Sequence, residues 1–208
     1  LKVKGMRIIK FWSICPMEHL LAQLELGNKI VSQRIVNLLF NSYLPLEKDP
    51  QTQISRITHL LQTNPAAARN FFVHAYKHMS VSSLTKVILL LGRFIRQCVK
   101  KELEKRGASQ EEEEEEEEEL NEEKENDEGE LTVDDVDLMS GLMETIVILW
   151  KAMPKQPKSA DADGCKWLQA YFSRALPSFF KVFQDSRIVS CLVLIAGHLP
   201  PNAIPTFS

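Results

Sequence analysis

The stretch NPAAARNFFVHAYKHM, residues 64–79, carries both a helix start and a helical period. Asn64 can cap a helix whose first position is Pro65, where the missing amide hydrogen has no intrahelical partner to lose. The apolar residues then recur at spacings of three and four, at Ala68, Phe71, Phe72, Ala75, Tyr76 and Met79. This spacing places them on one face, so the stretch predicts an amphipathic helix.

Segments on both sides of this stretch repeat the helical period. They are residues 28–43, 53–62, 83–106, 132–153, 163–184 and 186–199. Thr132 is the expected N-cap of its segment, and Pro177 is expected to kink or split the helix that contains it. No segment alternates apolar and polar residues as a half-buried strand does, so the chain is predicted to be all-α.

Helix pairs recurring about every 40 residues favour a HEAT-like helical-repeat solenoid. The sequence shows no sharp internal self-similarity at that period, so a plain helical bundle is the alternative. The chain begins at Leu1 without an initiator methionine and stops at Ser208 without a terminating element. We therefore expect a fragment of a longer solenoid.

One segment breaks the pattern, with nine consecutive glutamates at residues 111–119. Such a segment lacks the apolar surface needed to offset its ordering entropy, and predicts a disordered acidic insertion over residues 107–131. Helical-repeat segments 1–106 and 132–208 of the same solenoid are expected on either side. The insertion is interpreted either as a polyanion that competes with DNA or engages histone tails, or, preferably, as an inert or weakly modulatory solvated loop.

The formal net charge of −3 conceals a basic helical part. Residues 111–137 carry a net charge of −17, and the remainder carries +14. On segment 83–106, an arc of about 140° opposite the apolar face holds Lys86, Arg93, Arg96, Lys100 and Lys101. An outward stripe of this kind suits DNA phosphates, although an ordinary solvated face is the alternative.

The sequence offers no catalytic constellation. Phosphate-binding glycine loops and the GxSxG motif are absent, so we expect no enzyme activity, cofactor or small-molecule substrate. His74 and His78 have the spacing of two metal ligands, but no third ligand is predicted nearby, so no metal site is expected. No run approaches the roughly 18 apolar residues of a membrane span. The four cysteines are widely spaced, which fits a reducing compartment.

Aromatic residues gather in segment 163–184, at Trp167, Phe172, Phe179, Phe180 and Phe183. They are interpreted as core residues between helices, because large aromatic side chains are mostly buried. The alternative is a groove for a partner segment, as on the concave face of a solenoid.

Two stretches resemble the G2 subunit family of condensin II. They are VSQRIVNLLFNSYLP at residues 31–45 and LLQTNPAAAR at residues 60–69, the latter followed by Phe71 and Phe72. The resemblance covers about residues 28–105, in helix and link sequences rather than in catalytic motifs.

This resemblance implies a HEAT-repeat, non-SMC regulatory subunit found in the nucleus on chromosomes. Such subunits bind the kleisin subunit and contact double-stranded DNA or chromatin, so that the SMC ATPases can condense mitotic chromosomes. The ATP chemistry belongs to those other chains. The alternatives from the residues alone are an importin-like adaptor that binds protein cargo, and a scaffold of the phosphatase-subunit type.

Overall fold

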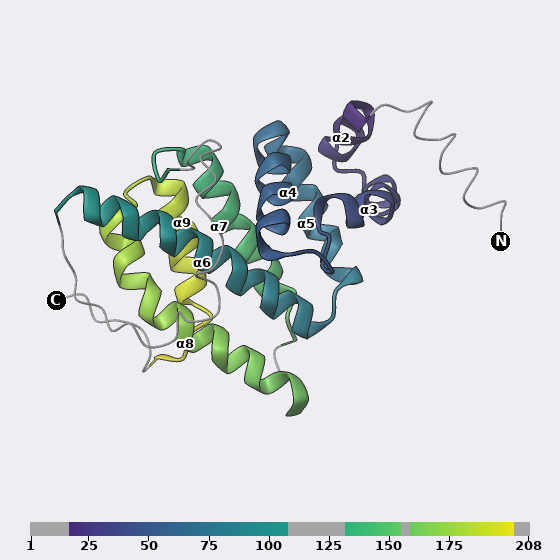
Figure 1. Ribbon diagram of the computed structural model, residues 1–208. Helices are drawn as coiled ribbons and strands as arrows, with labels where there is room; N and C mark the ends of the chain where they lie inside the picture. The colour runs from purple at the N-terminus through teal and green to yellow at the C-terminus, as the bar shows by residue number, and fades with distance from the viewer. Residues whose placement is uncertain (1–16, 108–131, 155–158, 202–208) are drawn as a thin grey trace.

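The structure is a computed structural model that describes residues 17–107, 132–154 and 159–201 (Figure 1). The acidic insertion expected over residues 107–131 lies outside the described residues, apart from Gly107. Residues 159–162 are described by their backbone alone.

The described residues contain helices and no strands, which confirms the all-α class for this part of the chain. In chain order, the helices are α2 (Met17–Glu25), α3 (Lys29–Tyr43), α4 (Pro50–Thr63), α5 (Pro65–Ala75), the 3-10 turn η1 (Tyr76–His78), α6 (Val81–Lys105), α7 (Val136–Lys151), α8 (Ser159–Val182) and α9 (Ser186–Ala196).

Side-chain caps set the starts of several helices. Asn64 caps α5 as predicted, with its Oδ1 accepting from the amide of Ala67 at 2.9 Å. Asn28 caps α3 in the same way, and Asp49 precedes Pro50 at the start of α4. These residues satisfy amide groups that have no partner within the helix.

Several expected boundaries were wrong. The cap of α7 is Asp135, which accepts from the amide of Leu138 at 3.0 Å, whereas Thr132 begins the turn before it. Helix α5 ends at Ala75 and is followed by η1, whereas one helix was expected over residues 64–79. Helix α2 was not predicted from the sequence. Pro177 lies inside α8 without splitting it. Burial of α8 on both sides of Pro177 offsets the lost hydrogen bond.

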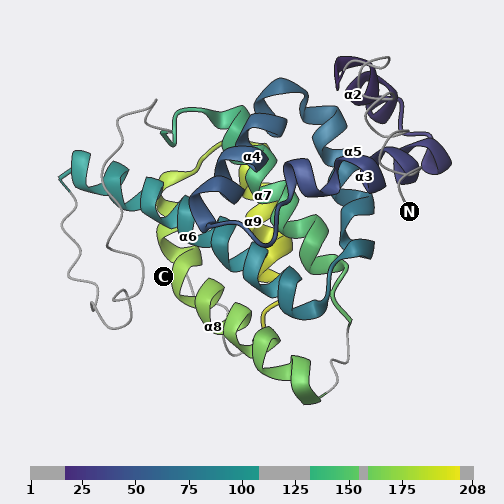
Figure 2. The ribbon, with the colours of Figure 1, turned by 45° about the vertical axis from the view of Figure 1, so that its right-hand side comes forward.

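The helices form two layers of stacked pairs. Consecutive helices α6 and α7 pack on each other, as do α8 and α9, while α6 also packs extensively on α8 and α7 on α9. Figures 1 and 2 both show α6 and α8 running side by side. Helices α4 and α5 extend this stacking toward α2 and α3. The arrangement agrees with the predicted helical-repeat fragment, in which each pair contacts its neighbours.

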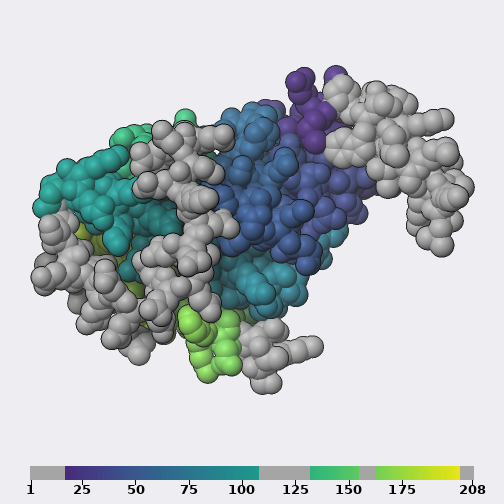
Figure 3. Space-filling model, viewed as in Figure 1, coloured from purple at the N-terminus to yellow at the C-terminus, as the bar shows by residue number. Residues whose placement is uncertain are grey.

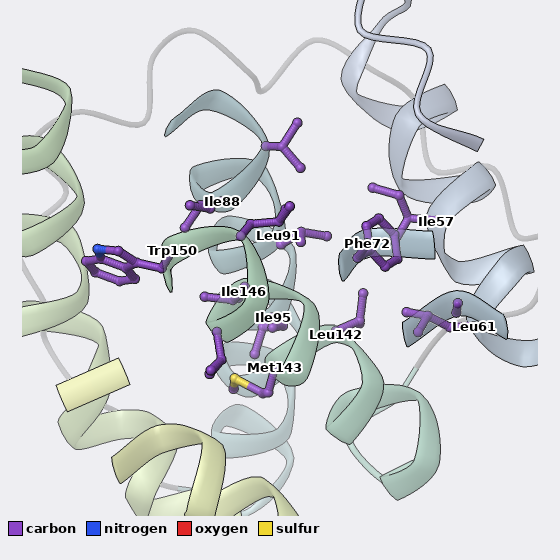
Figure 4. Packing of buried hydrophobic residues seen from close by; sticks show 14 of the residues in the cluster. Ile57, Leu61, Phe72, Ile88, Leu91, Ile95, Leu142, Met143, Ile146 and Trp150 are labelled. Carbon is purple, nitrogen blue, oxygen red and sulfur yellow. The ribbon is translucent and has the colours of Figure 1, made fainter. Parts of the chain in front are cut away.

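The core passes without interruption from the helices before the insertion to those after it. Figure 4 shows Ile57 and Phe72 facing the side chains of α6 and α7, among them Leu91 and Ile146. All four of these side chains are fully buried. Through these contacts, segments far apart in the sequence share one hydrophobic core.

Polar contacts tie distant helices together at the surface. The Asn70 side chain on α5 donates to the Leu24 carbonyl at the end of α2 at 2.9 Å. Arg69 pairs with Glu144 on α7 at 2.8 Å, and both side chains are substantially exposed. Exposed pairs contribute little to stability, so the apolar core carries most of the packing energy.

Candidate nucleic-acid interface

The outer face of α6 presents a line of basic side chains. Lys86, Arg93 and Lys100 are exposed and stand seven residues apart, so they follow one line for about 21 Å. The opposite face of α6 is buried against α4, α7 and α8. Figure 3 shows part of α6, in teal, at the molecular surface.

Arg96 and Lys101 flank this line on either side. Lys101 is exposed and Arg96 is half-buried. Both take part in interactions of their own. All five residues of the predicted stripe thus lie on α6, and the exposed side chains of Lys86, Arg93 and Lys100 form its middle line.

The charge of α6 changes sharply along its length. Between Val81 and Lys101 the helix carries no acidic residue. Beyond this point, Glu102 and Glu104 follow, and Glu102 pairs with Arg106 at 2.7 Å. Positive potential is therefore concentrated on the first twenty or so residues of the helix, where a polyanion would gain most.

His74 and His78 have different surroundings in the structure. The His78 ring packs on Phe40 with centroids 5.3 Å apart. Burial, reinforced by Lys77 and Lys29, lowers the pKa of His74, whose Nδ1 is buried without a hydrogen-bond partner. Over the described ranges, no three histidine, cysteine or acidic side chains cluster as metal ligands would. None of the helices described is long and apolar enough to cross a membrane.

The aromatic residues of α8 divide into two groups. Phe172, Phe179 and Phe183 are buried and Phe180 packs partly buried against the core, in agreement with the core interpretation. For Trp167 that interpretation was wrong, because its side chain is 55% exposed. At 100° per residue Trp167 lies about 140° from Phe172, so helical geometry could have placed it off the core face.

Stacked helix pairs, a continuous apolar core and a basic outer helix face define a helical-repeat scaffold. In the segment it spans, the chain belongs to the family of condensin-2 complex G2 subunits. It is 39% identical over 208 residues to "Condensin-2 complex subunit G2" of Danio rerio, covering 99% of this chain. It is also 39% identical to the protein of that name from Xenopus laevis and 37% identical to the one from Homo sapiens, each over all of this chain.

The similarity extends well beyond residues 28–105, where the sequence resemblance was strongest. The chain spans 17% of the Danio rerio protein and 18% of the other two. No family model matches the chain, and no solved structure matches it.

Proposed function

We propose that the chain is part of a non-catalytic regulatory subunit of condensin II, a scaffold that binds kleisin and double-stranded DNA during mitotic chromosome condensation. In this proposal it acts in the nucleus, on chromosomes, together with the SMC ATPase subunits. Segments 1–106 and 132–208 serve as one solenoid interrupted by the insertion. Similarity to G2 subunits along the whole chain supports the assignment to the complex.

The observation that carries the DNA assignment is the line of Lys86, Arg93 and Lys100 on the outside of α6. Its length of about 21 Å is more than half of one DNA helical turn of roughly 34 Å. Each phosphate that a basic side chain neutralises releases counterions, so the contact is strong at low salt and independent of sequence. Arg96 and Lys101 would contribute from the flanks.

The experiment is charge reversal in the intact condensin II complex, with Lys86→Glu, Arg93→Glu and Lys100→Glu combined. Duplex affinity is measured over a series of salt concentrations. Loss of three phosphate contacts should weaken binding and reduce the slope of log K against log salt by about 2.7.

A matched control carries Lys29→Glu, Arg34→Glu and Lys48→Glu, three exposed residues outside α6 with the same change in charge. This control tests for a general effect of net charge. If both triple variants lower affinity and slope equally, or if neither does, α6 is not the DNA contact.

A further inference from the structure

Helices α6 and α8 lie side by side and run in the same direction. Gly164 of α8 faces Thr85 of α6. Further along both helices, Gly92 of α6 faces Phe172 of α8. The contacts therefore advance in the same order along the two helices, as Figures 1 and 2 also show. The two helices thus keep one register over the length of their contact.

The exposed sides of these two helices open in the same direction. An open depression of about 240 Å³ lies between their N-terminal halves, and Lys86 of α6 and Trp167 of α8 both line it. Both side chains are also exposed to solvent. The exposed side of α6 at Lys86 and that of α8 at Trp167 therefore belong to one surface.

Steps of seven residues lead along this surface on both helices. On α6 this interval separates the three residues of the basic line described above. On α8 it leads from Trp167 to Arg174 and then to Lys181, both of which are exposed. Seven residues are nearly two helical turns, so each step advances about 10.5 Å with little rotation. We call Arg174 and Lys181 the α8 row.

The α8 row stands beside the basic line of α6. Because the helices share one register, Arg174 lies close to the level of Arg93, and Lys181 lies close to the level of Lys100. The axes of packed helices are about 8–10 Å apart. Two rows of positive charge are therefore separated by about this distance on one face of the protein.

Within α6 and α8, acidic residues lie only toward the ends of this surface. Asp161 and Asp163 stand in the first two turns of α8, and Glu102 and Glu104 lie in the last turn of α6. From Gly164 to Val182, α8 carries no acidic residue, just as α6 carries none over its first twenty or so residues. The middle of the surface is therefore uniformly positive.

Arg174 is the best placed member of the α8 row for an external contact. It forms no ion pair with any other residue that the structure describes. Lys181 takes part in an interaction of its own. An exposed guanidinium without an acidic partner can approach a phosphate with two parallel hydrogen bonds.

We propose that the α8 row contacts DNA phosphates together with the basic line of α6, so that this face holds both backbones of a duplex across its minor groove. The inference rests on the proposed DNA contact of α6 and extends that contact to a second helix. It assigns Arg174 and Lys181 to the DNA interface, in addition to the five basic residues of α6.

The spacing of the two rows favours two backbones over one. The phosphates of one backbone follow a single line, for which the basic line of α6 is sufficient. The minor groove of B-DNA is about 6 Å wide, so the backbones on its two sides lie within reach of long side chains on helices 8–10 Å apart. The major groove, about 12 Å wide, sets its backbones farther apart than the two rows.

The first test measures duplex binding by the intact condensin II complex over a series of salt concentrations. Arg174→Gln combined with Lys181→Gln should weaken binding about tenfold at physiological salt. It should also reduce the slope of log K against log salt by about 1.8, as expected for two lost phosphate contacts. A matched control, Lys29→Gln combined with Lys48→Gln, removes two exposed charges outside both helices and should leave the slope unchanged.

A second duplex distinguishes one backbone from two. One of its strands carries uncharged methylphosphonate linkages throughout. The basic line of α6 has three charges and should take the charged strand, so the α8 row faces the neutral one. Neutralising the α8 row should then weaken binding less than about twofold. The triple charge reversal of α6 should still lower affinity for this duplex, which shows that the α6 contact persists on it.

The outcomes separate this inference from the proposed function. An unchanged slope in the α8 variant, with a reduced slope in the α6 triple variant, would overturn the inference and leave the proposed function standing. Unchanged slopes in both variants would overturn both. So would a slope reduced in the α8 variant alone, because the α6 contact would then be missing.

Two further results would contradict the inference. If the α8 variant lost affinity equally for the two duplexes, both rows would follow one backbone. If the control lowered the slope as much as the α8 variant did, the effect would come from net charge rather than from Arg174 and Lys181.

Discussion

Gly92 on α6 and Phe172 on α8 are packed so closely that a Cβ atom on Gly92 would lie 2.9 Å from Phe172 Cζ. The same atom would lie 2.9 Å from Tyr171 Cε1. Alanine favours a helix over glycine by about 1 kcal/mol, but overpacking a core costs about 1–3 kcal/mol. We expect Gly92→Ala to loosen the α6–α8 interface, with hydrogen exchange in the intact subunit up to about tenfold faster in these two helices.

Two other glycines provide the controls for this prediction. A Cβ at Gly197 would make ordinary contacts of 3.4 Å or more, so Gly197→Ala should not speed exchange. At Gly141 the clash is with Leu61 Cδ2, the end of a flexible side chain, so Gly141→Ala should have an intermediate effect. Equal exchange rates in the variants of Gly92 and Gly197 would contradict close packing between α6 and α8.

Asn64 joins three helices, because it ends α4, caps α5 and donates to Glu25 of α2 at 3.0 Å. Asn64→Ala should cost about 1 kcal/mol, the usual loss for an N-cap. Asn64→Ser keeps a capping oxygen and should recover most of that loss. The measurement is local exchange at the start of α5, and an Asn64→Ala variant that exchanges like the wild type would exclude the cap as a stabilising contact.

Stability should fall as the pH falls below about 6.5, the pKa of an unperturbed histidine. Burial lowers the pKa of His74 and also that of His198, whose ring stacks on Trp150 with centroids 5.2 Å apart. The unfolded chain therefore takes up protons first on acidification. The contribution of these histidines is complete above pH 6.5 and is lost as pH falls toward their folded-state pKa values.

Thermal unfolding of the intact subunit at about pH 7.5 and about pH 5.5 tests whether stability falls on acidification, as predicted. The combination of His74→Gln and His198→Gln should shrink the difference in melting temperature between the two conditions. His19→Gln, at an exposed position on α2, should leave the difference as it is. A larger pH difference in the double variant would show that the sign is wrong.

Single substitutions should distinguish direct contacts with DNA phosphates from a general electrostatic attraction of DNA by the net positive charge. Arg93→Ala in the complex should lower the salt slope of duplex binding by about 0.9, the value for one phosphate. The loss of affinity should be the same for duplexes of unrelated sequence, because phosphate contacts carry no base information. A loss confined to one sequence would indicate a base contact instead.

Much of this fold was predictable because the helix caps and the apolar spacing in the sequence agree with the burial in the structure. The cap and proline at Asn64 and Pro65 set the start of α5, and the spacing from Leu84 to Val99 marked the buried face of α6. The start of α7 was misplaced because Thr132 and Asp135 both belong to residue types that cap helices well, and the structure uses Asp135. Of the two effects expected of Pro177, a split helix was wrong, because the cost of the proline is local, whereas the burial that offsets it comes from α6 and α9.

The basic line on α6 followed from helical geometry alone, since positions seven residues apart nearly coincide around a helix. The open depression of about 240 Å³ between the N-terminal halves of α6 and α8 could not be predicted in this way. It depends on Gly164 of α8 meeting Thr85 of α6, two residues whose proximity is fixed by tertiary packing. A sequence period describes one helix, and a pocket between two helices requires their relative positions.

The stacking of α4 to α9 has a mechanical consequence. The main contacts of each helix are with helices no more than three positions away along the chain. In such a quasi-one-dimensional array, small changes of angle between neighbouring pairs add up along its length. The segment should therefore bend elastically as a whole under an applied load, while the contact between each pair of neighbouring helices is kept.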